Sequence, residues 1–502
     1  MVPVFLAAAS ASRAPHARLL GAGFDFGTSG VRVAVLEPSR SSSEPVFSSS
    51  VALAPDAGAH EWLGALDALL GELPAELRAR LTHIGISGTS ATCVLTERDS
   101  PAAADGGGAA GELLGARPSL RGTRRYDWSA HSVPAVGARA LELIRRHAPA
   151  GHTACAPTSS LAKLVCWQLE QPLPRGAMLC HQADYLSAAL LDRAVTPTSD
   201  WHNALKLGFD VSDGALRYPD WLLALLRELG PVADPLGADA LPTVVRPGEP
   251  LGAVSRAAAA RWGLSAQCIV CAGTTDSIAA FLAATGGACS AGTAVTSLGS
   301  TIAIKLLSQS RADDAAFGLY SHRLGNRWLV GGASNAGCAV LREHFSDAEL
   351  TALSERIDAD AECDLGYVPL RASAVGERFP TPSADARQRL EPRPTSATHA
   401  DPEAAFLHAI LDALARVEAR GYTLLAERGA DAPHTILTCG GGSANVAFTR
   451  IRSRLLPVPA ERAKTVEASV GVALLALSEG DVGGAGPSPS VTWPIGDFSS
   501  DS

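Results

Sequence analysis

A short turn of glycine and hydroxyl residues separates two apolar segments at two places in this chain, more than half its length apart. The first copy has Asp25-Phe-Gly-Thr-Ser-Gly30 at its turn, and the second has Ser297-Leu-Gly-Ser-Thr301. Each copy predicts a strand, a tight turn and a second strand. Glycine lets the backbone approach a ligand closely, and successive amides beside hydroxyls form an anion-binding concavity. The two copies therefore predict a duplicated fold whose halves grip a polyphosphate between them.

The composition limits the class of protein. The 502 residues, of which 47% are hydrophobic and 19% charged, are enough for two or three domains with sizeable cores. The formal charge of −9 argues against nucleic acid as the main partner. No apolar run approaches the roughly 18 residues of a membrane-spanning helix, so no membrane partner is expected either. No pattern in the sequence indicates an oligomeric state.

The ten cysteines are scattered and do not form a disulfide framework. Cys268 and Cys271 have C-x-x-C spacing but lie in a strand-like apolar run without a second pair. We predict buried structural thiols there, with redox control as the alternative. The first 24 residues contain no Asp or Glu but include arginine and serine. This composition is typical of an organelle transit peptide, and an unstructured tail is the alternative.

Segments with helix-like and strand-like spacing alternate along the chain. Helical spacing occurs in residues 61–81, 159–170, 184–192, 277–282, 448–452 and 466–477, and strand-like runs occupy residues 83–87, 268–270, 328–332 and 435–438. Asp401 and Pro402 provide an N-cap and a first residue for a further helix. The alternation predicts an α/β fold with two related domains and a ligand in the cleft between them.

We divide the chain at the breaks in this pattern. Residues 1–18 form the possible transit or unstructured segment, 19–265 a first domain, 266–480 a second domain and 481–502 a disordered tail. The second half is expected to restart at the strand 268–270.

Two carboxylates stand beside predicted strand ends. Asp25 directly precedes the first turn, where its oxygens suit Mg²⁺, which prefers oxygen ligands and keeps several waters. Asp276 starts an otherwise apolar helix, whose dipole favours the anion. Such a group can accept the proton of a sugar hydroxyl that attacks phosphorus. Each aspartate alone could simply cap its own turn or helix, but the repeated turns favour the catalytic interpretation.

Other polar groups offer weaker signals. The segment Gly440-Gly-Gly-Ser-Ala-Asn445 lets a flat base or ribose lie against backbone, although such loops are often only loops. A second set stands at strand ends or helix starts, where it could bind a polyol or serve as caps and turns. This set comprises Thr89, Ser90, Thr92, Asp184 and Asn203.

Taken in order, these segments resemble the FGGY family of carbohydrate kinases over roughly residues 20–480. The two turns are similar to its two phosphate motifs, and the segment from Gly440 to Asn445 to its adenosine motif. The nearest branch is the cyanobacterial and plant-plastid one, xylulose-kinase-like proteins implicated in phosphorylating D-ribulose. Its motifs resemble residues 87–92, 159–163, 181–184, 203–206, 273–276 and 376–380. Two departures are an Ala/Gly-rich insertion before Tyr126, and Gly-Ser-Thr in place of the common Gly-Thr-Ser in the second turn.

The resemblance implies two actin-like ATPase (ribonuclease-H-like) domains, with the active site in the cleft between them, closing over sugar and Mg·ATP. It implies Asp276 as catalytic base, and Asp25 as a second catalytic residue that holds the magnesium. The residues expected at the nucleotide are Asp25, Thr28, Ser29, Gly299, Ser300, Thr301, Gly441, Gly442 and Asn445. Those expected at the sugar are Thr89, Ser90 and Asp276. The branch also implies a plastid location, with the cytoplasm as the alternative.

The function implied by the resemblance is ATP-dependent conversion of a ketopentose, D-ribulose to D-ribulose 5-phosphate, with D-xylulose as the alternative substrate. Two other classes fit part of the sequence. An actin-like ATPase switch would hydrolyse ATP regardless of sugar, and residues 87–92 and 273–276 count against it. A sugar-binding sensor would bind without phosphate transfer, and the intact Asp25 and Asp276 count against that.

Overall fold

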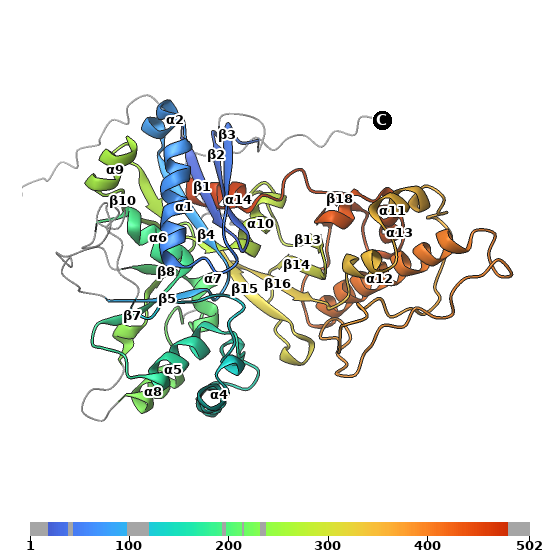
Figure 1. Cartoon of the computed structure of the whole chain (residues 1–502), viewed down its shortest axis with the longest axis horizontal. Coiled ribbons are helices and arrows are strands. Elements are labelled where there is room, and N and C mark those ends of the chain that lie inside the picture. Colours follow the sequence, from blue (N-terminus) through green and yellow to red (C-terminus); the bar gives the residue numbers. More distant parts are fainter. Residues whose placement is uncertain are drawn as a thin grey trace, which may run out of the picture.

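The computed structural model describes residues 19–38, 44–97, 120–192, 197–212, 215–230 and 237–479. Figure 1 shows two lobes side by side. One lobe is built around a seven-stranded sheet and the other around a six-stranded sheet. The segment 1–18 and the tail 481–502 lie outside the described residues.

The seven-stranded sheet of the first lobe has the order β10-β11-β4-β1-β2-β3, and β12 also pairs with β4. Its strands are β1 (Gly21–Phe26), β2 (Gly30–Leu36), β3 (Phe47–Ala52), β4 (His83–Gly88), β10 (Pro250–Ala253), β11 (Ile269–Cys271) and β12 (Thr274–Thr275). β1 and β2 form an antiparallel hairpin, and β1 runs parallel to β4.

The six-stranded sheet of the second lobe has the order β15-β16-β14-β13-β17-β18. Its strands are β13 (Thr293–Leu298), β14 (Ile302–Ser308), β15 (Tyr320–Leu324), β16 (Arg327–Ala333), β17 (Thr435–Cys439) and β18 (Ala460–Arg462). β13 and β14 form an antiparallel hairpin, and β13 runs parallel to β17. Each sheet therefore contains a hairpin whose first strand pairs in parallel with a later strand, which confirms the predicted hairpins and their duplicated arrangement.

Helices and two small sheets complete the described part of the chain. The first lobe has α1 (Ala59–Glu72), α2 (Ala75–Arg80), α4 (Pro134–His147), α5 (Ser160–Glu170), α6 (Gln182–Leu190), α7 (Trp201–Ala204), α8 (Asp220–Leu229) and α9 (Arg256–Trp262). After these come α10 (Asp276–Ala284), α11 (Asp347–Ser354), α12 (Pro402–Glu427), α13 (Val446–Leu455) and α14 (Ala468–Leu477). The small sheets pair β5 (Cys93–Glu97) with β6 (Thr123–Arg124) and β7 (Ala177–His181), and β8 (Thr198–Asp200) with β9 (Thr243–Val245).

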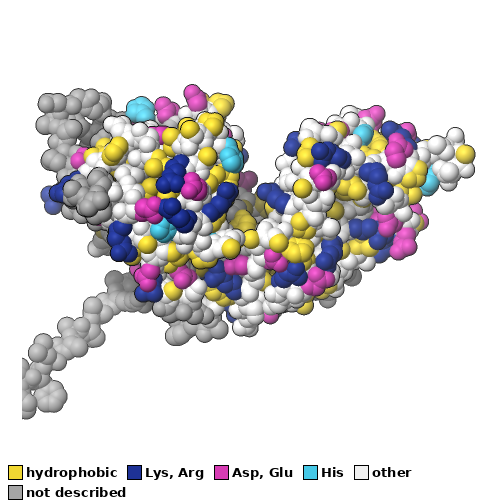
Figure 2. All heavy atoms as spheres, turned by 90° about the horizontal axis from the view of Figure 1, so that it is seen from below, with side chains coloured by type: hydrophobic (Ala, Val, Ile, Leu, Met, Phe, Trp, Pro, Cys, Tyr) yellow, Lys and Arg dark blue, Asp and Glu magenta, His cyan; other side chains and the backbone are white. Residues whose placement is uncertain are grey.

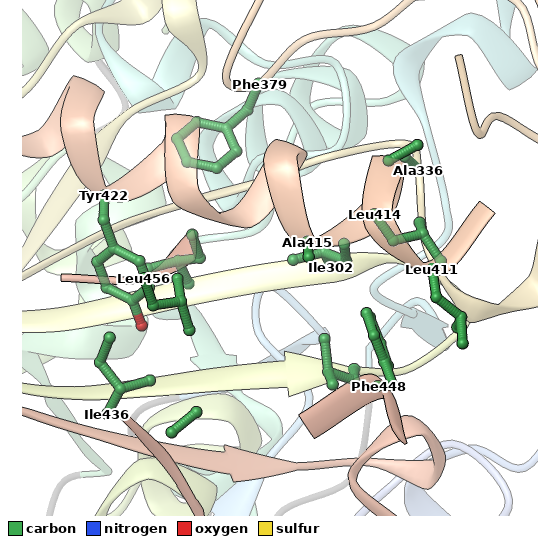
Figure 3. Close-up of a cluster of buried hydrophobic side chains, with 14 of the residues drawn as sticks. Ile302, Ala336, Phe379, Leu411, Leu414, Ala415, Tyr422, Ile436, Phe448 and Leu456 are labelled. Atoms are coloured by element: carbon green, nitrogen blue, oxygen red, sulfur yellow. The ribbon is translucent and has the colours of Figure 1, made fainter. Parts of the chain in front are cut away.

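Local sequence explains how several helices begin and end. The helical spacing over 61–81 is divided between α1 and α2, because Pro74 cannot donate a backbone hydrogen bond and has an extended ψ of 136°. Asp401 caps α12 as predicted, accepting a hydrogen bond from the amide of Ala404. In Figure 3, Leu414 and Tyr422 of α12 lie with Ile302 of β14 and Ile436 of β17 in one buried cluster. Burial of this face holds α12 on the second sheet.

The C-terminal helix α14 returns to the first lobe, where it lies beside β1 and α10 (Figure 1). Two glycines permit this close packing. A Cβ at Gly23 of β1 would lie 2.0 Å from the carbonyl oxygen of Ser469, and one at Gly471 would lie 1.8 Å from that of Ala279. Every residue of β1 is consequently buried.

The expected restart of the second half at strand 268–270 is wrong. β11 pairs with β10 and β4 of the first sheet, and β12 also pairs with β4. A boundary at 265/266 therefore falls before the chain leaves the first sheet. The reason is that strand periodicity does not encode which strand will be the partner.

All ten cysteines are unpaired, and Cys268 and Cys271 are buried, as predicted. Burial raises the pKa of the Cys268 thiol to about 12, which disfavours the reactive thiolate.

Candidate active site

The turn of the second hairpin, residues 299–301, is held by the segment that follows β16. The amide of Cys338 donates to the carbonyl oxygen of Gly299 at 2.9 Å, and the amide of Ile302 donates to that of Ala336 at 2.8 Å. A Cβ at Gly337 would lie 2.4 Å from the Cα of Thr301. The small size of residue 337 therefore allows the two segments to touch.

The glycine loop after β17 lies on the same turn. Gly440 has a φ of 83°, and a Cβ there would lie 2.6 Å from the carbonyl oxygen of Leu298. A Cβ at Gly442 would lie 2.6 Å from Cys338 Sγ. Gly441 is exposed, with open space around its missing side chain. The structure thus brings the predicted residues of the second turn together with Gly441 and Gly442.

Asn445, predicted at the nucleotide, has both ends of its amide engaged within the protein. Its Oδ1 accepts from the amide of Phe448 at 2.9 Å and caps α13, and its Nδ2 donates to Ser354 Oγ at 2.7 Å. A contact with the nucleoside stays a prediction for this residue. Its observed contacts cap α13 and join the end of the glycine loop to Ser354 of α11.

The first turn presents its hydroxyls to solvent. Thr28 and Ser29 are both exposed at the tip between β1 and β2. The amide of Gly27 donates to the carbonyl oxygen of Gly30 at 3.0 Å and closes the turn. Both hydroxyls are therefore free to meet a ligand from outside the lobe.

Asp25 lies near the end of β1, beside Ser87 of β4, with which it is in register. Its side chain accepts a hydrogen bond from Ser87 Oγ at 2.9 Å, and only 6% of the residue is exposed. Burial raises the pKa of Asp25 to about 6, the bond from Ser87 opposes this, and the negative charge of Asp276 adds to it. Asp25 is thus a carboxylate held in a site that would favour a cation beside it.

Asp276 is the first residue of α10 and directly follows β12. Thr275 lies opposite Gly88, next to Ser87, so the pairing of β12 with β4 brings Asp276 toward Asp25. The Asp276 side chain accepts from the amide of Ser277 at 2.6 Å. Burial raises its pKa, while this hydrogen bond and the charges of Lys305 and Lys206 oppose the rise. A raised pKa suits a group that accepts a proton.

Lys206 and Lys305 are functional candidates that the sequence reasoning missed. Lys305 lies on β14 and donates from Nζ to the carbonyl oxygen of Ser277 at 2.5 Å. Lys206 lies on the short 3-10 helix Leu205–Leu207. Two sequence signals could have found them: only four of the 42 Lys and Arg residues are lysines, and Lys206 ends the segment 203–206 that resembles a family motif.

The predicted sugar residues Thr89 and Ser90 differ in their surroundings. Thr89 is buried, and its hydroxyl lies 2.6 Å from that of Thr92 and 3.1 Å from Gln182 Oε1. Ser90 is half-buried and precedes Ala91, which has a φ of 63°. The ammonium of Lys163, itself fully buried, donates to the carbonyl oxygen of Ala91 at 2.6 Å. Ser90 is therefore the more exposed of the two, and Thr89 is held inside the protein by its contacts with Thr92 and Gln182.

Figure 2 shows the surface hollowed between the two lobes, with Lys and Arg side chains on both sides. The carboxylates come from the elements of the first sheet and the glycine turn from the second, so a ligand touching both would lie between the lobes. Within the described ranges, no group of three or more His, Cys, Asp or Glu side chains is placed to hold a metal ion. Mg²⁺ prefers oxygen ligands and commonly binds one or two carboxylates and the phosphates of its substrate, so the buried carboxylate of Asp25 suits it chemically. No helix in the described part of the chain could span a membrane.

Residues 287–479 match the sequence profile of the C-terminal domain of the FGGY family of carbohydrate kinases. The structure is similar to a "xyloylose kinase" from Brucella ovis, with a TM-score of 0.71, 22% identity, and 92% of this chain and 90% of that one covered. It is also similar to a xylulose kinase from Rhodospirillum rubrum, with a TM-score of 0.69, 22% identity, and 91% and 89% covered. A Plasmodium falciparum glycerol kinase with ADP gives a TM-score of 0.67, 15% identity, and 92% and 90% covered.

These likenesses confirm the predicted fold class, an α/β fold with two actin-like ATPase domains. Residues 287–479 match the C-terminal domain of the FGGY carbohydrate kinases, and the chain as a whole has the fold of the similar sugar kinases.

Proposed function

We propose that this protein is an ATP-dependent carbohydrate kinase that phosphorylates a ketopentose, converting D-ribulose to D-ribulose 5-phosphate. The observation that carries the proposal is the approach of two carboxylates, the buried Asp25 and the half-buried Asp276, beside the first of the two glycine-hydroxyl turns. The match of residues 287–479 to the FGGY C-terminal domain supports the class of reaction. The similarity of residues 87–92 and 273–276 to the D-ribulose branch supports the choice of sugar.

In the proposed reaction, Asp276 accepts the proton of the sugar hydroxyl as that oxygen attacks the γ-phosphorus of ATP. Burial raises the pKa of Asp276 and so favours proton transfer to it. Asp25 would hold Mg²⁺, which when bound neutralises charge on the phosphates. The amides and hydroxyls of the two turns would bind the phosphate oxygens, and closure of the lobes would keep water from the reacting phosphoryl group.

The test of the function is a panel of ketoses, aldoses and polyols with coupled detection of ADP. We expect ADP release that depends on sugar, with D-ribulose giving the highest kcat/KM. Preference for D-xylulose would identify the second candidate, which the resemblance to xylulose kinase structures favours. ADP release of equal rate with and without sugar would instead identify an ATPase and overturn the proposal.

Asp276→Asn is the direct test of the proton acceptor. The amide keeps the size of the side chain but cannot take the proton, so we expect the sugar-dependent rate to fall by about 100-fold to 10,000-fold. The free energy of unfolding and the affinity for ADP serve as controls and should change little. Near-full activity of this variant would show that the base assignment is wrong.

A further inference from the structure

Lysine is rare in this chain, and three of its four lysines gather around the candidate active site. The chain has 42 Lys and Arg residues, and its only lysines are Lys163, Lys206, Lys305 and Lys464. Arginine therefore supplies almost every positive charge on the surface. Lysine differs from arginine in being a compact point charge on a flexible stem.

The position of Lys305 is set by the second sheet. Lys305 of β14 is in register with Gly331 of β16, which in turn is in register with Tyr320 of β15. A Cβ at Gly331 would lie 2.2 Å from the carbonyl oxygen of Ile304, so glycine lets β16 lie close against β14 beside Lys305. The Lys305 ammonium reaches the carbonyl oxygen of Ser277 at 2.5 Å, one residue beyond Asp276. It therefore connects the second hairpin to the N-terminus of α10.

The position of Lys206 is set by the turn of helix before it. His202 of α7 hydrogen-bonds Thr274 Oγ1 of β12 at 2.8 Å through Nδ1, and the carbonyl oxygen of Arg323 at 2.6 Å through Nε2. These bonds fix the segment that carries Lys206 between the strand leading to Asp276 and the edge of the second sheet. Lys206 is half-buried, and its ammonium makes no hydrogen bond or ion pair with the described residues.

The two lysines face Asp276, whereas Asp25, the other carboxylate of the site, interacts with Asp276 and with neither lysine. Lys206 and Lys305 interact with each other and with Asp276, so two ammonium groups share one carboxylate. Burial lowers the pKa of both lysines, and Asp276 favours their charged forms. Lys206 donates no hydrogen bond to the described residues, and a half-buried cation is stabilised when an anion pairs with it. The site is therefore complementary to an anionic group beside Asp276.

We propose that Lys206 and Lys305 hold the transferring phosphoryl group from the two lobes while Asp276 takes the proton of the acceptor hydroxyl. The inference rests on the proposed kinase function and deepens it. The sugar oxygen forms a bond to the γ-phosphorus, and the bond between that phosphorus and the bridging oxygen breaks, leaving its electron pair on ADP. The two ammonium groups stay protonated throughout and bind the equatorial phosphoryl oxygens, on which charge is spread.

Lys206→Met and Lys305→Met test the pair. With the best sugar of the panel, we expect each substitution to lower kcat by about 100-fold or more, the effect of one lost donor to a transition-state anion. The KM for sugar should stay within about threefold. A second readout is the tight complex of ADP, aluminium fluoride and sugar, which resembles the phosphoryl group in transfer. Both variants should lose this complex while keeping their affinity for ADP alone.

Arg139→Met is the matched control, because it removes one positive charge from an exposed pair with Glu142 on α4, away from the site. It should leave kcat and the aluminium fluoride complex unchanged. Lys305→Arg should not restore kcat, since a planar guanidinium does not fit where a point charge is needed. If Lys305→Met does not fold, Lys206→Met still tests the proposal, because the Lys206 ammonium donates no hydrogen bond to the described residues.

Several outcomes would overturn the inference. An active wild type with variants whose kcat lies within threefold of it refutes the phosphoryl contact alone. Equal losses of ADP affinity and kcat would mean a structural role and refute it as well. A wild type without sugar-dependent ADP release refutes the kinase proposal and this inference together.

Discussion

Asp25 is a carboxylate that the folded protein keeps at a cost in stability. Only 6% of the residue is exposed, Ser87 is its hydrogen-bond partner, and the negative charge of Asp276 is nearby. Burial raises its pKa to about 6, above the ordinary value of 3.8. The folded chain thus binds this proton more readily than the unfolded chain does. The protonated Asp25 side chain therefore contributes to the free energy of unfolding. This contribution is fully present below about pH 4 and is lost as the pH rises through about 6.

Asp25→Asn should therefore stabilise the ligand-free protein at pH 8. An amide accepts the bond from Ser87 without a buried charge, so the free energy of unfolding should rise by up to about 3 kcal/mol. The advantage should shrink between pH 6 and pH 4, where the wild-type carboxyl becomes protonated. Urea unfolding in EDTA at several pH values measures both effects. Kinase activity should be lost in the same variant, because Mg²⁺ loses its carboxylate ligand.

A constant difference between Asp25→Asn and wild type across this pH range would contradict the assignment of the raised pKa to Asp25. A fully active variant would separately contradict its role at the metal.

At the scale of elements, the glycine loop after β17 combines positions that need glycine with one that does not. Gly440 has a positive φ and touches Leu298, and Gly442 touches Cys338. Gly441 lies between them in open space. Gly440 and Gly442 therefore allow the loop to pack against its neighbours, while Gly441 leaves open space in which a ligand could lie on the loop.

Gly440→Ala and Gly441→Ala should separate these roles. A Cβ at 440 would lie 2.6 Å from a backbone oxygen, so Gly440→Ala should lower the free energy of unfolding by about 1–3 kcal/mol. Gly441→Ala should change it by less than about 0.5 kcal/mol. If the nucleoside lies on Gly441, the same change should raise the KM for ATP about tenfold, equivalent to about 1.4 kcal/mol. Chemical unfolding and ATP titration measure the two effects, and an unchanged KM would remove Gly441 from the nucleotide site.

At the scale of the whole molecule, α14, near the end of the described chain, packs against β1, near its beginning. It packs beside α10, and on β1, β4 and β2 of the first sheet. Asp25 is on the same strand as Gly23, over which α14 passes. The position of a site carboxylate in the first lobe therefore depends on a helix that follows the whole second sheet in sequence.

Gly23→Ala tests this dependence. Its Cβ would lie 2.0 Å from the carbonyl oxygen of Ser469, so α14 must move, and we expect a loss of about 3 kcal/mol in the free energy of unfolding. Activity should fall as well, because β1 carries Asp25. Gly71→Ala is the control: it lies in α1 with nothing within 4 Å, and alanine should stabilise that helix by about 0.5–1 kcal/mol. A Gly23→Ala protein as stable and active as wild type would contradict the close packing of α14.

The local features of this molecule could be predicted from its sequence. Both hairpins, the capped start of α12 at Asp401 and the start of α10 at Asp276 follow from glycine turns, capping residues and apolar spacing, all of which act over a few residues. Pro74 also indicates that the helix ends there, but the apolar spacing continues on both sides of it and predicted one helix over 61–81. The composition of the second turn predicts a phosphate site, and that of the glycine loop predicts a site for a base or ribose.

The partners across long distances were decided by the tertiary structure. Apolar spacing predicted a strand at 268–270 and a helix at 466–477, but only packing placed both on the first sheet. The bonds that engage Thr89 and Asn445, and the approach of Lys206 and Lys305 to Asp276, likewise join residues far apart in sequence. Sequence alone therefore determined the turns, the caps and the residue types of the site. Burial and strand pairing decided which charged side chains lie close to Asp276, and no local sequence pattern encodes either of them.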